Sequence, residues 1–142
     1  MANFQFFDAF AGNLGAGNIN LDTDNFAAVL SNTAFNPSSA EEIGDITQIS
    51  AGNGYTTGGV PLTGVSWGQA APGIWQWDAN DFGWTATGGS LTFRYIVVYD
   101  ADTDKLVGYW DAGTQVTIVN GFQFTVEVGA NGIFRIGPGT LS

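Results

Sequence analysis

The fold is decided by the stretch Leu91-Thr-Phe-Arg-Tyr-Ile-Val-Val-Tyr99, which is dense in β-branched and aromatic residues. In a strand, successive side chains point to opposite faces. One face would carry Leu91, Phe93, Tyr95, Val97 and Tyr99, and the other Thr92, Arg94, Ile96 and Val98. Since both sets are apolar toward the end of the stretch, we expect a central strand that is buried on both faces there.

A hairpin is predicted directly after this strand. The turn Asp100-Ala-Asp-Thr-Asp104 is rich in turn-forming residues and leads into a second strand, Lys105-Leu-Val-Gly-Tyr-Trp110. Asp111-Ala-Gly113 predicts another turn, and the next strand is expected over residues 115–119.

The dipeptide Asn120-Gly121 is the strongest short hairpin signal in the chain, because both residues suit a type I′ turn. Residues 122–128 then alternate strictly between apolar and polar side chains. The side chains expected to point inward are Phe122, Phe124, Val126 and Val128. A turn at 130–132 leads into a last predicted strand over 133–136.

The first half of the chain is less regular. Further strands are expected at 19–21, 26–30, 47–50, 65–67, 74–77 and 82–85. Near the start, Phe6, Phe7 and Phe10 are spaced for one or two helical turns within residues 4–10, ending around Gly12.

These patterns predict an all-β fold: an antiparallel β-sandwich, jelly-roll-like, with a short N-terminal helical or extended segment. The length of 142 residues is close to the commonest domain size, so we expect one domain over 1–142. Residues 1–17 are expected to form a docking or arm segment.

The composition argues against an enzyme. The chain has no His, no Cys and only three cationic residues, which are Arg94, Lys105 and Arg135. It therefore cannot build a Ser-His-Asp triad, a Cys-His pair or a His/Cys zinc site. The Gly-rich stretch 52–59 lacks the Gly-Lys-Ser/Thr of a phosphate loop, which indicates a turn or a flexible arm. We expect no catalytic activity and no cofactor.

The charge argues against two classes of partner. A formal net charge of −10 repels nucleic-acid backbones and anionic lipid surfaces. No apolar run approaches the ~18–20 residues of a membrane helix. Met1-Ala2-Asn3 does not begin a signal peptide, so synthesis in a cytosol is expected. The expected partners are other proteins.

Asp100, Asp102 and Asp104 have the spacing that opens many calcium loops. An EF-hand is excluded, because its sixth position requires Gly and is Lys105 here. An unrelated oxygen-rich turn can still bind Ca²⁺. The simpler interpretation is a polar hairpin turn in which Asp side chains accept bonds from the backbone.

A weaker enzyme hypothesis concerns Asp78 and Asp81, which lie among tryptophans like the paired carboxylates of a glycosidase. The simpler interpretation is that both acids cap a loop between strands. The five Trp residues also raise the hypothesis of sugar binding by stacking, and the alternative is that they fill a core or a protein interface.

The order of several segments is more specific than the composition. It runs through Asn-Ile-Asn-Leu (18–21), Phe-Ala-Ala-Val-Leu (26–30), Gly-Asp-Ile (44–46), Gly-Asn-Gly-Tyr-Thr-Thr-Gly-Gly (52–59), Phe-Gly-Trp-Thr (82–85), Phe-Arg-Tyr-Ile-Val-Val-Tyr-Asp (93–100), Lys-Leu-Val-Gly-Tyr-Trp-Asp-Ala-Gly (105–113), Asn-Gly-Phe-Gln-Phe-Thr-Val (120–126) and Gly-Ile-Phe-Arg-Ile (132–136). Over nearly the whole chain, this order resembles the small structural proteins of tailed bacteriophages, especially the β-sandwich cement or decoration proteins of capsids.

The resemblance implies a virion structural protein with no catalytic residues. Such proteins clamp neighbouring copies of an HK97-like major capsid protein from the outside of the shell, often as dimers or trimers. A location on the outer surface of the capsid is therefore expected. The alternative is a phage tail or fibre module that binds host glycans through exposed tryptophans.

A protein that bridges others needs aromatic anchors. Phe4, Phe6, Phe7 and Phe10 are the candidates for a docking segment, since four rings so close together are costly to leave in water. The alternative is that these rings fold back onto the protein's own core. Further interface candidates are Tyr55, Trp75 and Trp77.

Overall fold

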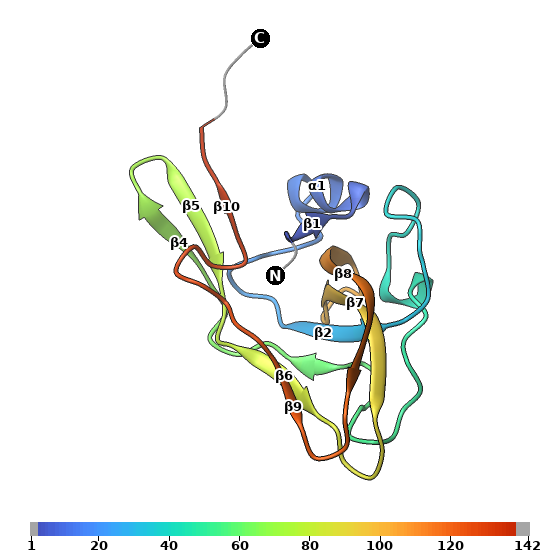
Figure 1. Cartoon of the computed structure of the whole chain (residues 1–142). Coiled ribbons are helices and arrows are strands. Elements are labelled where there is room, and N and C mark those ends of the chain that lie inside the picture. The colour runs from blue at the N-terminus through green and yellow to red at the C-terminus, as the bar shows by residue number, and fades with distance from the viewer. Residues whose placement is uncertain (1–2, 139–142) are drawn as a thin grey trace.

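The computed structural model describes residues 3–138 of the chain, and within this range the fold is almost entirely β (Figure 1). Its elements are β1 (Gln5–Phe6), α1 (Asp8–Gly15), β2 (Phe26–Ser31), the 3-10 turn η1 (Ile43–Asp45), β3 (Val60–Pro61), β4 (Ser66–Ala71), β5 (Ile74–Asp78), β6 (Phe82–Thr85), β7 (Leu91–Asp100), β8 (Leu106–Ile118), β9 (Gln123–Val126) and β10 (Phe134–Ile136). The predicted fold class is confirmed as far as an all-β arrangement of antiparallel sheets. The jelly-roll arrangement stays a prediction.

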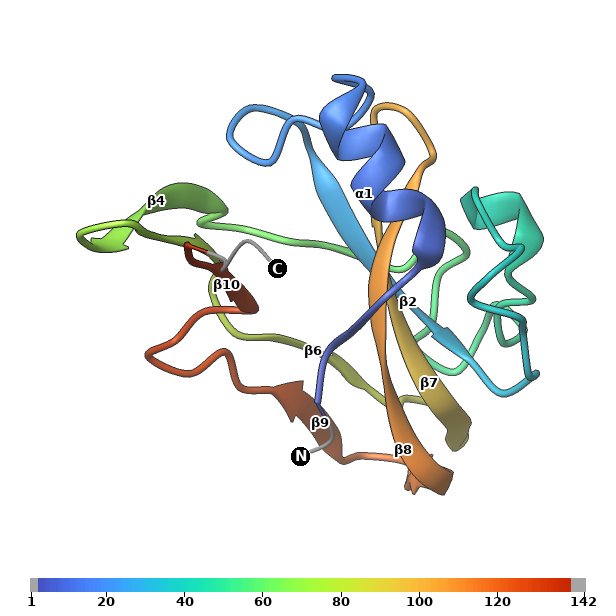
Figure 2. The same cartoon turned by 90° about the horizontal axis from the view of Figure 1, so that it is seen from above.

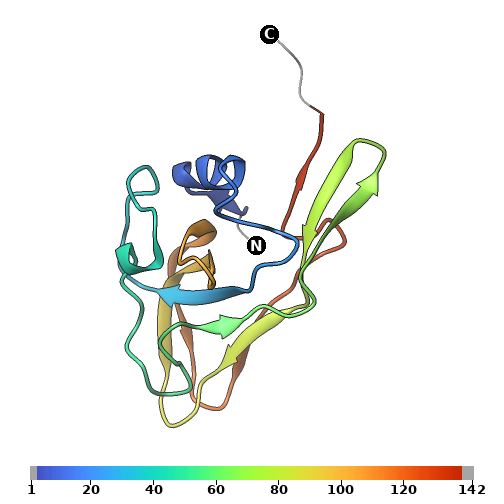
Figure 3. The same cartoon turned by 180° about the vertical axis from the view of Figure 1, so that it is seen from behind.

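The strands form three antiparallel sheets. The largest has the order β1-β8-β7-β2-β3, the second has the order β10-β5-β4, and β6 pairs with β9. Figures 1 and 3 show the β4–β5 hairpin and β10 projecting together from one side of the molecule, away from β7 and β8. The helix α1 lies against β8, as the view in Figure 2 also shows.

One hydrophobic cluster joins the three sheets. The ring of Phe26 on β2 meets Trp77 on β5 edge-on at 4.8 Å, and Trp77 is fully buried. At the other end of the cluster, the ring of Phe93 on β7 meets Phe124 on β9 at 5.1 Å. The large sheet therefore packs against both small sheets through aromatic pairs.

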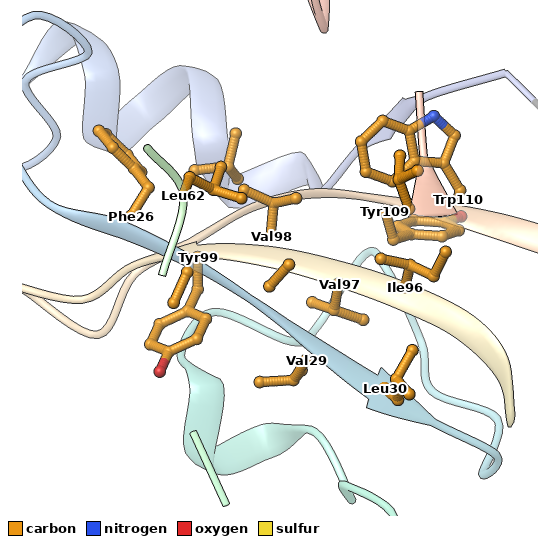
Figure 4. Packing of buried hydrophobic residues seen from close by; sticks show 14 of the residues in the cluster. Phe26, Val29, Leu30, Leu62, Ile96, Val97, Val98, Tyr99, Tyr109 and Trp110 are labelled. Atoms are coloured by element: carbon orange, nitrogen blue, oxygen red, sulfur yellow. The ribbon is translucent and has the colours of Figure 1, made fainter. Parts of the chain in front are cut away.

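The strand β7 confirms the central strand that the sequence predicts, because every residue from Ile96 to Asp100 is buried. Figure 4 shows Val98 on one side of the β7 ribbon and Val97 and Tyr99 on the other. The strict alternation breaks earlier in the strand. Phe93 contacts Phe124 of β9, whereas Tyr95 contacts Phe35 of a loop, because the pairing register shifts between Phe93 and Tyr95.

The predicted turn at 111–113 is wrong, because β8 continues through it as one strand. Tyr95 pairs with Asp111 and Phe93 pairs with Val116, so residues 112–115 bulge out opposite Arg94. The Arg94 guanidinium fixes this bulge with two hydrogen bonds to the Asp111 carboxylate, at 2.9 and 3.2 Å. A bulge bends the strand without ending it, which the local sequence does not distinguish from a turn.

The Asn120-Gly121 hairpin is also wrong. The strand that follows pairs with β6 instead of returning along β8. Phe122 N–H donates to the Val119 carbonyl at 2.9 Å, and of the two central residues only Gly121 has a positive φ, of 91°. A type I′ turn requires both central residues there. Phe122, which was predicted to point inward, is 66% exposed beyond this turn.

The N-terminal segment, which was predicted to be helical or extended, is extended first and helical afterwards. β1 pairs with β8, with Gln5 opposite Tyr109 and Phe6 opposite Gly108, and the helix begins only at Asp8. A Cβ at Gly108 would collide with the Phe4 ring, so this glycine permits the close approach of the segment. Residues 1–2 of the predicted docking segment lie outside the described residues.

In the first half, the strands predicted at 26–30, 65–67, 74–77 and 82–85 are confirmed as β2, β4, β5 and β6. The strands predicted at 19–21 and 47–50 are wrong. Ile19 and Leu21 are buried within a loop, and Gln48 forms only an isolated bridge with Ser31. Burial of apolar side chains in loops produces the same sequence pattern as a short strand.

Gly59 and Gly88 offer a matched test of the close packing between β2 and the residues before β3. Their φ values are +78° and +80°, but a Cβ at Gly59 would overlap the Ala28 carbonyl, whereas a Cβ at Gly88 meets no described atom within 4 Å. Gly88→Ala should cost about 1–2 kcal/mol of unfolding free energy through its φ alone. Gly59→Ala should cost about 1–3 kcal/mol more through the overlap. Urea unfolding of both variants measures the difference, and equal losses would contradict the packing.

Candidate functional site

An aromatic cluster joins the N-terminal segment to the small sheet β10-β5-β4. Phe134 on β10 is its centre. The distances from its ring centroid are 6.0 Å to Phe4, 4.9 Å to Phe6, 5.9 Å to Phe10, 6.3 Å to Trp67 and 5.5 Å to Trp77. Segments from both ends of the chain are therefore held together by ring contacts.

Part of this cluster reaches solvent. Phe134 pairs with Trp77, and Ile136 pairs with Trp75, so all four side chains share one face of the small sheet. Trp75 also stacks on Trp67 with centroids 6.0 Å apart. We define the aromatic surface as Phe4, Phe6, Trp67, Trp75, Phe134 and Ile136.

Within the aromatic surface, Phe6, Trp75 and Ile136 are each 42% exposed, and the other members are half-buried. Groups of exposed apolar side chains on one face of a protein often mark interaction sites. The aromatic surface is therefore the candidate interaction site.

Four of the predicted interface residues do not reach this surface. Phe7, Phe10, Tyr55 and Trp77 are buried, so they are core residues in this structure and are not exposed to a partner. Phe7 packs against Phe35 and Tyr109, at 5.4 and 5.2 Å. The alternative that these N-terminal rings fold back onto the core therefore holds for Phe7 and Phe10, while Phe4 and Phe6 lie in the aromatic surface.

Tyr55 fixes the Gly-rich stretch 52–59 to the large sheet. Its hydroxyl donates to Gln48 Oε1 at 2.6 Å and accepts from the Leu30 N–H at 3.3 Å. Burial raises the pKa of Tyr55 to about 12, so this hydroxyl stays protonated. The Tyr99 hydroxyl donates to the Gly58 carbonyl at 2.9 Å. The stretch is a covering layer of the sheet rather than a flexible arm.

A second candidate site is the acidic cluster, which we define as Asp24, Asp100 and Asp102. One carboxylate oxygen from each residue lies within 4.8 Å of the other two. Asp24 precedes β2, Asp100 ends β7 and Asp102 lies in the following turn. Because Phe26 pairs with Asp100, the antiparallel register brings Asp24 to this turn.

The acidic cluster is held by hydrogen bonds from the backbone. Asp100 Oδ1 accepts from the N–H groups of Asp102 and Thr103, at 2.9 and 3.3 Å. Asp102 Oδ2 accepts from the Asn25 N–H at 2.8 Å. Asp100 is fully buried, and its Oδ2 accepts no hydrogen bond from the described residues. Burial and the nearby Asp24 raise the pKa of Asp100 from 3.8 to about 7.

The sequence identified two of the three acids in this cluster. Asp104 lies outside it, because its backbone adopts a φ of 64° and its N–H donates to the Asp100 carbonyl to close the turn. Asp24 was missed, since it is far from Asp100 along the chain. Only the pairing of β2 with β7 reveals it, and the sequence gives no register for these strands.

The acids of the glycosidase hypothesis have structural roles. Asp81 Oδ1 accepts from the Val128 N–H at 2.7 Å, and Asp78 Oδ1 accepts from the Ala79 N–H at 2.9 Å. Asp78 also lines a polar hollow of about 360 Å³ together with Gln76 and Arg135, but Asp81 is not part of its lining. Trp75 and Trp77 alternate with Gln76 and Asp78 along β5 and so point to the other face of that sheet.

Comparison with known proteins gives no relative: no protein-family model, curated protein or solved structure matches the chain significantly. The resemblance to phage decoration proteins therefore stays a prediction. Among residues 3–138, the structure has no helix that is long and apolar enough to cross a membrane.

The raised pKa of Asp100 predicts a pH dependence of stability. Its folded-state pKa of about 7 exceeds the ordinary 3.8, so the ionised form favours the unfolded chain. This destabilisation is absent below about pH 4, grows as the pH rises and is complete above about pH 7. Asp100→Asn should therefore gain unfolding free energy relative to the unmodified protein across this window.

The measurement is urea unfolding in a chelator at several pH values from 4 to 8. The difference in unfolding free energy between Asp100→Asn and the unmodified protein should grow with pH. Asp104→Asn is the control for removing a carboxylate from the same turn but outside the acidic cluster. A difference for Asp100→Asn that stays constant with pH would contradict the raised pKa.

Proposed function

We propose that the protein is a non-enzymatic structural protein of a tailed-phage virion, a cement or decoration protein on the outer surface of the capsid. In this role it bridges and stabilises subunits of an HK97-like major capsid protein, itself bound as a dimer or trimer. The aromatic surface is the observation that carries the proposal.

The aromatic surface has the properties of a docking site. Burying an exposed Phe or Trp at an interface contributes roughly 1.5–3 kcal/mol for each side chain. Aromatic anchors of this kind dominate the binding energy of protein interfaces. Phe6 stacks on the buried Phe10 at 5.1 Å, so the exposed ring is held in one position before a partner binds. A side chain that is already ordered loses less entropy on binding.

The charges support a partner that is a protein rather than nucleic acid. Arg94 is paired with Asp111, and Lys105 is paired with Glu42. Arg135 Nε donates to Gln76 Oε1 at 2.8 Å. The net charge of −10 is therefore not relieved by any cationic patch built from these residues, and the surface repels packaged nucleic acid. This suits a protein bound outside the shell.

The alternative is a tail or fibre module that binds host glycans through exposed tryptophans. A sugar site needs an aromatic ring beside polar groups that bond the hydroxyls. The polar hollow at Gln76 and Arg135 has no aromatic residue in its lining. Trp75 is exposed on the opposite face of that sheet. These positions favour the decoration protein over the glycan-binding module.

The test is binding to shells assembled from the capsid protein of the same phage without this protein. The double variant Phe6→Ser/Trp75→Ser should bind at least about tenfold more weakly, a loss of about 1.4 kcal/mol or more. Phe122→Ser is the matched control, because Phe122 is the most exposed large apolar residue described and lies outside the aromatic surface. Sedimentation of shells with bound protein gives the affinity, and circular dichroism confirms that each variant is folded.

Full loading by the folded double variant would contradict docking through the aromatic surface. Absence of binding by the unmodified protein, together with retention on a glycan array, would favour the alternative. Deleting residues 1–10 is a poorer test, because it removes the buried Phe7 and Phe10 and weakens the fold itself.

A further inference from the structure

We propose that the acidic cluster of Asp24, Asp100 and Asp102 binds a calcium ion, which ties the β7–β8 turn to the segment that leads into β2. This inference does not depend on the proposed function. It rests on the convergence of three carboxylates and on a buried carboxylate oxygen without a hydrogen-bond donor.

Asp100 Oδ2 is the first argument. Asp100 is fully buried, and none of the described residues donates a hydrogen bond to this oxygen. Its other oxygen, Oδ1, is already held by the N–H groups of Asp102 and Thr103. Oδ2 therefore remains as the oxygen that Asp100 contributes to the centre of the cluster. In its ionised form, a carboxylate oxygen buried in this way is costly unless a donor or a cation partners it.

The other two carboxylates are positioned in advance. Asp24 Oδ2 accepts from the Asn20 N–H at 2.9 Å. The two oxygens of Asp102 accept from Asn25, Oδ2 from the backbone N–H at 2.8 Å and Oδ1 from the side-chain amide at 3.2 Å. These bonds fix the side chains while each oxygen keeps a lone pair for a metal ion. Asp24 is half-buried and Asp102 is exposed, so an ion can enter from solvent.

The ligand set selects a hard cation. All three ligands are carboxylate oxygens, and the chain has no His or Cys that would favour zinc or another transition metal. Two oxygens on opposite sides of Ca²⁺ are roughly 4.6–5.2 Å apart, and on opposite sides of Mg²⁺ roughly 4.0–4.2 Å. The three carboxylate oxygens lie within 4.8 Å of one another, so one ion of either size can reach all of them. Mg²⁺ requires strict octahedral geometry, whereas Ca²⁺ accepts irregular sets of oxygen ligands, so the cluster favours Ca²⁺.

The position of the cluster explains what the ion would do. The turn and the segment before β2 already touch, because the Ala101 N–H donates to the Asn25 carbonyl at 2.7 Å. Three like charges at this junction repel one another. A bound divalent cation would attract all three carboxylates and so offset that repulsion. Calcium would therefore strengthen the junction of β2 and β7 in the large sheet.

The first measurement is a thermal unfolding series on the full chain, stripped with a chelator and then given Ca²⁺ or Mg²⁺. The midpoint of the unmodified protein should rise by several degrees with millimolar Ca²⁺ and by less with Mg²⁺. Calorimetric titration with Ca²⁺ gives the affinity, and terbium luminescence reports occupancy of the site. An unmodified protein with no Ca²⁺ shift, no heat of binding and no terbium signal would overturn the proposal.

Asp24→Asn and Asp104→Asn are the paired variants. Asp24→Asn removes one ligand charge and should weaken the binding of Ca²⁺ at least tenfold. In chelator, this variant should be as stable as the unmodified protein or more so. Asp104→Asn removes the same charge from the same turn but outside the cluster, and Asn tolerates its φ of 64°. It should keep the full Ca²⁺ shift. Equal losses of Ca²⁺ affinity in the two variants would mean nonspecific charge binding and would overturn the site.

Discussion

Burial of β7 on both faces is the constraint on which the rest of this structure depends. A sheet whose central strand is apolar on both sides needs two covering layers, and a chain of this size has few elements to supply them. On one side the layer is built from the two small sheets, through the contacts of Phe26 with Trp77 and of Phe93 with Phe124. On the other side, loops supply Phe35 and Tyr55. The loops that carry Phe35 and Tyr55 are therefore part of the packed structure and do more than connect strands.

The same constraint shapes the acidic cluster. Because β7 stays buried to its last residue, the hairpin turn begins inside the protein and Asp100 is carried into the core. The Asp100 side chain stabilises the turn, since its Oδ1 accepts hydrogen bonds from two backbone N–H groups. Its second oxygen is then left among other carboxylates, at an electrostatic cost that neutral residues would avoid. A bound cation, as we propose, would offset this cost.

The sequence predicts the strands well where burial and local pattern agree. It fails where the pairing with a distant segment determines the structure. The bounds of β6 and the two-sided burial at the end of β7 follow from residue type alone. The bulge after Asp111 is defined by the register between β8 and β7, and the partner of β9 is β6, far away in the chain. For the same reason Asp24 could not be assigned to the acidic cluster, and Phe7 could not be separated from Phe6. Neighbouring residues of one strand point to opposite faces, but only the paired strand determines which face is core.

The aromatic surface exists only in the folded chain, which distinguishes it from a docking peptide. Its members come from β1 and the residue before it, from the β4–β5 hairpin and from β10, and Phe4, Phe6 and Trp67 meet around Phe134. A flexible aromatic arm would have to be ordered at the moment of binding, and that entropy would weaken its affinity. Here β1 is already paired with β8, and Phe6 is already stacked on Phe10. These side chains are already ordered when the protein folds, so a partner would meet a rigid surface. The affinity of that surface would depend on the stability of the sheet beneath it.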